Sequence, residues 1–252
     1  IPIFIAAMLN SDKLLKLIPG VLILLAIGAA YNGHTLLKSA KPERLPSIYQ
    51  HWDAMGQIKM FAYPGDEARG MVIDNAANTP VYHFDGDYTL PDSGAEDLWG
   101  IPAGDLIHQF DSCRFLSLGS GGGADVIQAL MEGATEVHAV EVNPWFNKML
   151  TEGDPSGYLS TYLDTLDTTL TMLPEYTSQF YQDPRVIVVS EDARAFIRRH
   201  TSRFDVIYSL SSNTFAALAS GSFALAENYL FTTEAFQDYW TALSDSGYLM
   251  ME

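Results

Sequence analysis

Residues 114–124 read Arg-Phe-Leu-Ser-Leu-Gly-Ser-Gly-Gly-Gly-Ala, an apolar run that leads into a glycine-rich turn. The run Arg114 to Leu118 predicts a strand, and Gly119 to Gly123 predict a tight turn before a helix that begins at Ala124. Because glycine lacks a Cβ, a ligand can press against such a turn, and the free amides of the first helical turn can face it. Alone, this pattern is a weak sign of a nucleotide site, since tight turns use glycine for their own sake.

Strand-like and helix-like segments alternate from Ser112 to the end of the sequence, which indicates a parallel sheet flanked by helices. The predicted strands are Arg114 to Leu118, Val137 to Val142, Arg185 to Ser190, Asp205 to Ser209 and Tyr248 to Met251. The predicted helices are Ala124 to Glu132, Ala193 to His200 and Thr233 to Leu243. We therefore expect residues 111–252 to form an α/β domain with a Rossmann-like, doubly wound, mostly parallel sheet. The sequence stops inside the last strand, so we expect this domain to be incomplete at its C-terminal end.

Three shorter strand-like segments precede this region. They are Gln57 to Tyr63, Gly70 to Asp74 and Thr79 to Phe84. Each is bounded by Pro, Gly, Asn or Asp, and residues 40–50, with two prolines, are interpreted as a linker. We expect residues 45–110 to form a small antiparallel β unit that ends in the acidic loop Asp85 to Asp97.

The front of the chain is mostly apolar. Leu17 to Tyr31 form fifteen residues without a charge, fewer than the ~20 that cross a bilayer. Residues 14–16, which end in a snorkelling Lys16, would lengthen the span, so we expect a short or tilted transmembrane helix. The alternative is a buried or interfacial hairpin, which Pro19 and Gly20 favour because both weaken a helix in water.

Charge is divided unevenly along the chain. The first 44 residues carry five basic and two acidic side chains, or +3, and the other 208 carry nine and 29, or −20. Lys38, Lys41 and Arg44 form a basic neck after the apolar span. We therefore predict that residues 1–44 are a membrane-associated segment, with the following domain in the cytoplasm by the positive-inside rule. The acidity of that domain excludes nucleic acid as a partner, because phosphates would be repelled.

The sequence offers no pattern for a metal site. Cys113 is the single cysteine, and the six histidines are scattered without the spacing of a ligand pair. We expect no metal cofactor.

Two carboxylates follow strands at the edge where the glycine turn lies. Glu141 ends the second strand, where a carboxylate can accept hydrogen bonds from both ribose hydroxyls of a nucleoside. The spacing from Gly121 to Glu141 also fits a dinucleotide fingerprint, so an NAD-linked oxidoreductase is an alternative. Asp192 follows the third strand within reach of an adenine amino group, although Asp is also a favoured helix N-cap.

Here the chain resembles the spermidine synthase branch of the class I S-adenosylmethionine-dependent transferases. The matching stretches are 115–123 (FLSLGSGGG), 137–144 (VHAVEVNP), 183–196 (DPRVIVVSEDARAF), 204–208 (FDVIY) and 230–249 (LFTTEAFQDYWTALSDSGYL). Residues 70–79 (GMVIDNAANT) resemble the small N-terminal β domain of the family more loosely. The apolar front end together with residues 224–232 (ALAENYLFT) is similar to membrane-fused spermidine synthase-like proteins.

The resemblance implies a fold of the class I methyltransferase type and S-adenosylmethionine or its decarboxylated form as the cofactor. It implies that Gly119, Gly121 and Gly123 line the methionine-derived part of the nucleoside. It also implies that Glu141 holds the ribose and that Asp192 with Ala193 holds the adenine.

The chain departs from the family where an aminopropyl group would be transferred. Gly122 stands where the family has an Asp in the glycine loop, and residues 210–214 read Leu-Ser-Ser-Asn-Thr. The catalytic Asp thus becomes Leu210 and the second Asp becomes Asn213. A leucine can neither deprotonate an amine nor hold a cation, so the usual aminopropyl chemistry is in doubt.

Other residues are candidates for the missing catalytic groups. Asp125 lies in the first turn after the glycine loop, and Glu227 with Tyr229 lies in the loop after the fourth strand. Their structural alternatives are a helix-dipole position for Asp125, a solvated charge for Glu227 and a core position for Tyr229. For methyl transfer, Ser211 and Asn213, with Ser209 and Ser212, can orient a polar acceptor by hydrogen bonds.

The sequence therefore predicts group transfer from S-adenosylmethionine, or its decarboxylated form, to a small acceptor, for which an amine is one candidate. A methyltransferase for an unrelated small molecule is one alternative. A catalytically inactive domain that senses a nucleoside for a membrane partner is another. A homodimer is one candidate assembly.

Overall fold

The computed structural model describes residues 20–29, 47–53, 55–62, 68–73, 77–89, 103–153, 173–209 and 229–251. The chain divides into two compact units, residues 1–46 and 47–252. In the first unit the structure describes one helix over residues 20–29, with exposed apolar side chains such as Leu24 and Leu25. Within the described residues no helix is both long and apolar enough to span a membrane, so the predicted transmembrane helix finds no support there.

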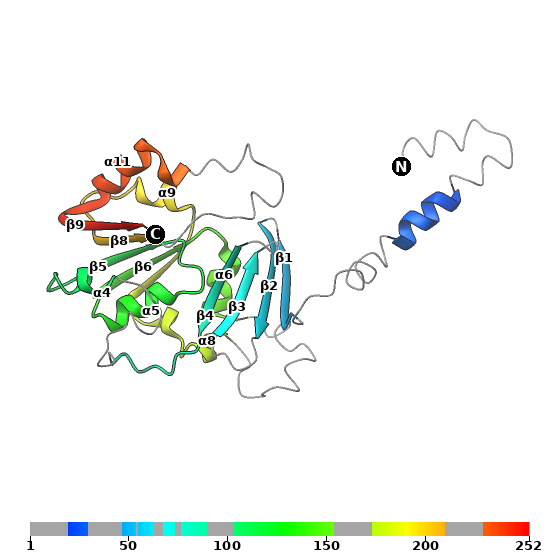
Figure 1. Cartoon of the computed structure of the whole chain (residues 1–252), viewed down its shortest axis with the longest axis horizontal. Coiled ribbons are helices and arrows are strands. Elements are labelled where there is room, and N and C mark those ends of the chain that lie inside the picture. Colours follow the sequence, from blue (N-terminus) through cyan, green and yellow to red (C-terminus); the bar gives the residue numbers. More distant parts are fainter. Residues whose placement is uncertain are drawn as a thin grey trace. The chain divides into compact units, whose positions relative to one another are not determined.

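The second unit begins with a small antiparallel sheet (Figure 1). Its strands, in the order β1-β2-β3-β4, are Tyr49–Asp53, Gly56–Ala62, Ala68–Ile73 and Ala77–Tyr82. The antiparallel unit that we predicted is therefore confirmed, but it has a strand more than expected. β1 was missed because Pro42 and Pro46 suggested a linker, whereas both prolines precede the strand and interrupt none of its pairing with β2.

A parallel sheet follows, as the alternating pattern predicted. Its order is β7-β6-β5-β8-β9, and each neighbouring pair is parallel. The strands are β5 (Arg114–Leu118), β6 (Glu136–Glu141), β7 (Val186–Ser190), β8 (Phe204–Ser209) and β9 (Leu243–Met251). The chain runs outward from β5 to β7 and then returns to the other side of β5, which is the doubly wound topology.

Helices cover both faces of this sheet (Figure 1). The longer ones are α5 (Ala124–Met131), α6 (Pro144–Thr151), α9 (Ala193–Ile197) and α11 (Thr233–Ala242). Apolar residues of α5 and α6 share one core with Phe115, while those of α9 and α11 share the other with Leu116, because successive strand residues face opposite sides. The short elements are α4 (Gly104–Ile107), α8 (Leu173–Tyr176), η2 (Phe180–Gln182) and η3 (Tyr229–Phe231).

The two sheets of the second unit share one hydrophobic core. Met60 and Met71 of the small sheet are fully buried in the same cluster as Phe115 and Ile127 of the parallel domain. β4 is the edge strand of the small sheet and contacts α5. The small sheet therefore lies against the glycine turn that precedes α5.

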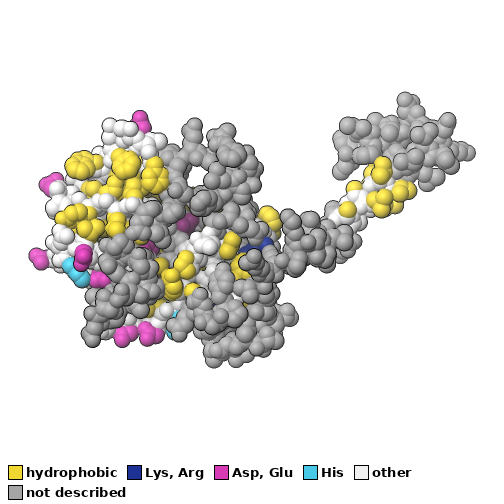
Figure 2. All heavy atoms as spheres, viewed as in Figure 1, with side chains coloured by type: hydrophobic (Ala, Val, Ile, Leu, Met, Phe, Trp, Pro, Cys, Tyr) yellow, Lys and Arg dark blue, Asp and Glu magenta, His cyan; other side chains and the backbone are white. Residues whose placement is uncertain are grey.

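The surface of the described residues shows the excess of acidic over basic side chains in the sequence. On the face in Figure 2, acidic side chains are spread over the parallel domain, and apolar side chains gather over α11. Within residues 231–240 three aromatic side chains are exposed, Phe231, Phe236 and Trp240, and Trp240 is 80% exposed.

Candidate functional site

The strand order defines one edge of the parallel sheet as the place for a ligand. The strand order reverses between β5 and β8, because β6 and β7 lie on one side of β5 and β8 and β9 on the other, and ligands of such folds bind beyond the carboxyl ends of the strands at that point. The glycine turn Gly119 to Gly123 follows β5, Glu141 ends β6, and Asp192 comes two residues after the end of β7. The structure thus places the three predicted nucleoside-binding segments on adjacent strands at one edge.

The glycine turn has a backbone that favours glycine at three positions. Gly119, Gly121 and Gly123 have φ values of +77°, +47° and +80°, in the left-handed region. Gly119 is exposed, and a Cβ added to it would meet no described atom within 4 Å. Of the three predicted glycines, Gly119 therefore leaves space where a ligand can approach the backbone.

The other glycines of the turn are packed against protein. A Cβ on Gly122 would lie 1.9 Å from the Pro80 carbonyl oxygen, and one on Gly123 would lie 2.5 Å from the Phe180 ring. A Cβ on Gly121 would lie 2.8 Å from Thr79 Oγ1. These positions require glycine because β4 and η2 come so close, which the sequence did not predict.

Glu141 is buried and bonded to the turn. Its Oε2 accepts from the Gly121 amide at 3.2 Å, and its Oε1 accepts from the Asn143 amide at 2.8 Å. Burial raises the pKa of the Glu141 carboxyl, and these backbone hydrogen bonds partly offset that rise. Each carboxylate oxygen can accept a second hydrogen bond, so Glu141 can still receive ribose hydroxyls.

Asp125 lies beneath the same turn, in the first turn of α5. The residue is 6% exposed, and burial raises the pKa of its carboxyl to about 6. The Ser117 hydroxyl and the Val126 amide lower that pKa, whereas the negative charge of Glu141 raises it. The structure thus brings Asp125 and Glu141 together as two buried carboxylates, a pairing that the sequence did not predict.

Tyr181 joins this cluster from η2. Its hydroxyl group donates to Ser120 Oγ at 3.1 Å, and its ring is buried against Gly123. Burial, followed by the charges of Asp125 and Glu141, raises the pKa of Tyr181, so the phenol remains a donor at every physiological pH. Nothing in the local sequence around Tyr181 indicates this contact, because it depends on how distant segments pack.

Asp192 acts as a helix cap in the structure. Its Oδ1 accepts from the Ala195 amide at 2.8 Å, at the N-terminus of α9. Asp192 is therefore the N-cap of α9, which was the structural alternative for this residue, and Ala193 is the first residue of that helix. Since β7 lies beside β6, both residues remain at the candidate edge, and their contact with adenine stays a prediction.

The other catalytic candidates are outside the described residues or at their border. Ser211, Asn213 and Glu227 lie between the described ranges 173–209 and 229–251, and Tyr229 begins the short helix η3. Their roles stay predictions. In the described part of the chain, no group of three or more His, Cys, Asp or Glu residues is arranged to hold a metal ion.

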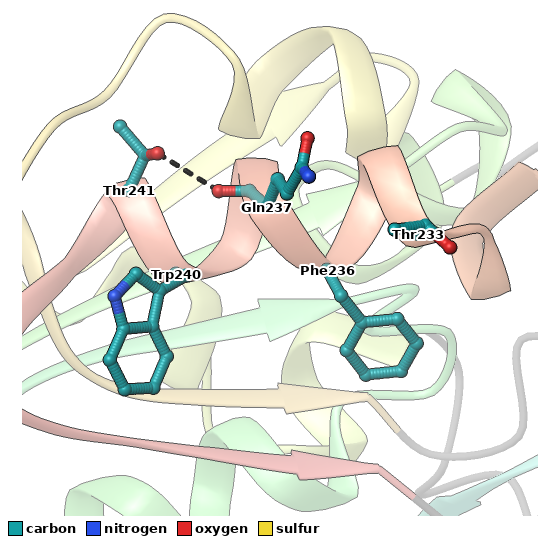
Figure 3. A pocket seen from close by; sticks show the side chains of 5 residues that line it. All are labelled: Thr233, Phe236, Gln237, Trp240 and Thr241. Carbon is teal, nitrogen blue, oxygen red and sulfur yellow. Dashed lines mark hydrogen bonds between the residues drawn. The ribbon is translucent and has the colours of Figure 1, made fainter.

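A shallow groove on α11 is a separate feature. In Figure 3, Phe236 and Trp240 project from the same side of the helix, and the Thr241 hydroxyl donates to the Gln237 carbonyl at 2.9 Å. The groove is lined by Thr233, Phe236, Gln237, Trp240 and Thr241. Because it holds no charged side chain and none of the predicted site residues, we do not assign the chemistry to it.

Comparison with known proteins identifies the fold. Spermidine synthase from Thermotoga maritima matches with a TM-score of 0.51 and 19% identity, over 81% of this chain and 55% of that one. A spermidine synthase in complex with the transition state analogue AdoDATO has a TM-score of 0.49 and 18% identity over the same shares. A SAM-dependent methyltransferase from Thiobacillus denitrificans, in complex with S-adenosyl-L-homocysteine, has a TM-score of 0.37 and 14% identity, over 67% and 50%. Neither a protein-family model nor a curated protein sequence matches the chain.

The likeness to the Thermotoga maritima structure shows the fold. This chain spans about half the length of that structure. The predicted fold class is confirmed: a Rossmann-like sheet of the methyltransferase type with a small antiparallel sheet.

Proposed function

We propose that the second unit transfers a group from S-adenosylmethionine, or its decarboxylated form, to a small acceptor. The observation that carries this proposal is the pair formed by Glu141 and Gly121 at the carboxyl edge of β5 and β6. A carboxylate that is held against a glycine turn at this edge suits a ribose, and Gly119 leaves room for the rest of the nucleoside. The fold that it shares with the spermidine synthase from Thermotoga maritima supports the same class of reaction, a group transfer.

The charge of the site suits a sulfonium compound. Asp125 and Glu141 are both buried, and each has a raised pKa, so both would be stabilised by a positive charge nearby. A dinucleotide brings a pyrophosphate, which two buried carboxylates would repel. This difference favours the sulfonium nucleoside over the NAD alternative.

The proposed reaction needs little from the protein beyond alignment. A lone pair of the acceptor attacks the carbon next to sulfur, the carbon–sulfur bond breaks, and its electrons stay on sulfur as a neutral thioether. An amine acceptor must lose one proton, which passes to Asp125 or to water. The positive charge on sulfur disappears during transfer, so carboxylates near it favour the bound substrate over the transition state. We therefore assign Glu141 to binding rather than to acceleration.

Calorimetry on the full chain tests this proposal. Wild type is titrated with S-adenosylmethionine, with its decarboxylated form and with NAD(H), and we expect one of the first two to bind. Glu141→Gln should weaken that binding at least about tenfold, because it removes a charged hydrogen-bond acceptor. Glu136→Gln is the matched control, since Glu136 begins the same strand at its opposite end and bonds to His138 and Arg203.

Product analysis separates the versions of the reaction. S-adenosylhomocysteine as the product would identify a methyltransferase, and methylthioadenosine would identify an aminopropyltransferase. Binding without turnover of labelled nucleoside, across amine and non-amine acceptors, would favour the sensing alternative. Binding of NAD(H) in place of both sulfonium nucleosides would overturn the proposal.

A further inference from the structure

A residue of the small sheet holds the glycine turn of the parallel domain. Thr79 Oγ1 accepts a hydrogen bond from the Gly122 amide at 2.9 Å, across 43 residues of sequence. The contact is tight, since a Cβ on Gly121 would lie 2.8 Å from this oxygen and one on Gly122 would lie 3.1 Å from it. The loop and β4 therefore fit against each other as a specific contact.

The register of the small sheet explains how Thr79 reaches the loop. Thr79 pairs with Met71, and Met71 pairs with Met60, so these three side chains share one face of the sheet. Met60 and Met71 are fully buried in the core shared with the parallel domain, which turns this face toward the glycine turn. Pro80 follows on the edge strand, where its missing N–H costs no pairing.

Two consecutive amides of the turn donate to different acceptors. Gly121 donates to Glu141, and Gly122 donates to Thr79. The peptide between them is free to rotate in an isolated glycine segment, because glycine restricts its backbone least. Thr79 removes that freedom and so fixes the direction in which the loop faces Glu141.

We propose that Thr79 is a positioning residue of the nucleoside site. Its hydroxyl group holds the Gly121–Gly122 peptide in the orientation that lets Glu141 and the loop receive the nucleoside together. This inference rests on the proposed function, and it makes the small sheet a working part of the site. Thr79 need not touch the ligand, since it acts through the loop.

Substitutions of Thr79 test whether the site needs its hydroxyl group or only the shape of its side chain. Thr79→Val keeps the β-branched volume that suits a strand and removes the acceptor, whereas Thr79→Ser keeps the hydroxyl group. Thr79→Ala repeats the loss of the acceptor in case valine disturbs packing. Thr241→Val on α11 is the matched control, because the exposed Thr241 hydroxyl bonds to the Gln237 carbonyl of its own helix.

The first measurement needs no ligand. Amide hydrogen exchange at Gly122, followed by NMR, should be at least about tenfold faster in Thr79→Val and Thr79→Ala than in wild type, because a protecting hydrogen bond is lost. Thr79→Ser and Thr241→Val should exchange at close to the wild-type rate. Equal exchange in wild type and in both acceptor-free variants would overturn the proposal.

The second measurement is nucleoside affinity by calorimetry. Thr79→Val and Thr79→Ala should bind about threefold to tenfold more weakly, and Thr79→Ser should stay within about twofold of wild type. Wild-type affinity in both acceptor-free variants would overturn the positioning role while the proposed function stands. Absence of binding in wild type would instead overturn the proposed function, and the exchange measurement would still decide whether Thr79 holds the loop.

Discussion

The Gly121 amide donates a hydrogen bond to the Glu141 carboxylate at 3.2 Å, which joins the turn after β5 to the end of β6. A ligand at this edge meets a carboxylate whose position is already fixed by two backbone amides, since the Asn143 amide donates to it as well. Little reorganisation is therefore needed when a ribose binds. Holding the Glu141 carboxylate there lowers the stability of the folded protein, because burial disfavours its charged form and raises its pKa.

Burial also raises the pKa of Asp125, and its cost to stability can be measured. Its folded-state pKa of about 6 lies above the unfolded value near 3.8, so the folded protein binds a proton more tightly than the unfolded chain. Ionised Asp125 therefore lowers stability above pH 6, and the penalty vanishes as the pH falls toward 4. We expect Asp125→Asn to raise the free energy of unfolding by about 2 kcal/mol at pH 8, with a smaller gain at pH 5. Urea unfolding at both values checks this, and a constant difference would contradict it.

Nucleoside binding should depend on the same group. Below about pH 6 Asp125 becomes neutral and no longer attracts a sulfonium ion. Between pH 7 and pH 5 we expect the dissociation constant of wild type to rise about threefold to tenfold, from a Coulomb attraction of about 1 kcal/mol. Calorimetry of Asp125→Asn over the same range should give a nearly flat profile. A wild-type profile that is equally flat would remove Asp125 from the site.

The contact of Gly122 with β4 predicts a steric cost. Gly122→Ala places a Cβ 1.9 Å from the Pro80 carbonyl oxygen, so the two sheets must move apart. We expect a loss of about 3 kcal/mol. Gly133→Ala is the control, because Gly133 has a φ of +88° and no described atom within 4 Å of an added Cβ. It should lose only the backbone cost of the left-handed conformation, about 1–2 kcal/mol. If thermal unfolding shows that Gly133→Ala loses as much stability as Gly122→Ala, or more, then β4 can move away from the glycine turn at little cost.

An ion pair ties β5 to β8 at the opposite edge. Arg114 donates to both oxygens of Asp205, at 2.9 and 2.8 Å from its side chain, and to Oδ2 at 3.0 Å from its backbone. Burial alone raises the pKa of Asp205, but the hydrogen bonds from Arg114 lower it overall. This stability is fully present above the unfolded pKa near 3.8, and it is lost at lower pH, as the pH falls through the lower pKa of the folded state.

Removing the ion pair of Arg114 and Asp205 should therefore lower the free energy of unfolding at neutral pH. We expect Asp205→Asn to cost about 2 kcal/mol in urea unfolding at pH 7, because a charged, largely buried bidentate pair is broken. Glu191→Gln, which breaks the exposed pair of Glu191 with Arg199, should leave stability unchanged. A loss of stability in Glu191→Gln, with unchanged stability in Asp205→Asn, would contradict this prediction.

Cys113 should be chemically silent in the folded protein. The side chain is 1% exposed, and burial with the nearby charge of Asp205 raises the pKa of the thiol to about 12. A thiol reagent at pH 8 should leave the native protein unmodified and should label one cysteine after denaturation, because only the thiolate reacts. Fast labelling under native conditions would show that the start of β5 opens locally.

The parallel sheet could be predicted because its strands are buried apolar runs. Arg114 to Leu118 was predicted with its observed bounds, whereas β9 begins at Leu243 rather than at Tyr248. The polar residues before Gly247 suggest a turn, and the register between β8 and β9 does shift there, since Phe204 pairs with Leu243 and Val206 with Tyr248. Pairing of Leu243 with Phe204 starts the strand earlier than the local sequence indicates. Helix α6 was also missed, although Asn143 and Pro144 are a typical cap and first residue.

The candidate site could be predicted only where it follows strand ends. Glu141 and the glycine turn were found from their position after apolar runs, because parallel strands carry their carboxyl ends to one edge. Thr79 and Tyr181 could not be found in this way, since their contacts depend on which surfaces of distant segments meet. No local pattern specifies such a meeting.

The core that both sheets share has a consequence for cooperativity. Met60 and Met71 lie in the same apolar cluster as Phe115 and Ile127, so neither sheet can lose its packing alone without exposing the residues of the other. The second unit should therefore melt in a single transition, with probes in β2 and in β5 reporting the same midpoint. A nucleoside that binds at the glycine turn should then raise the melting temperature of the small sheet as much as that of the parallel one.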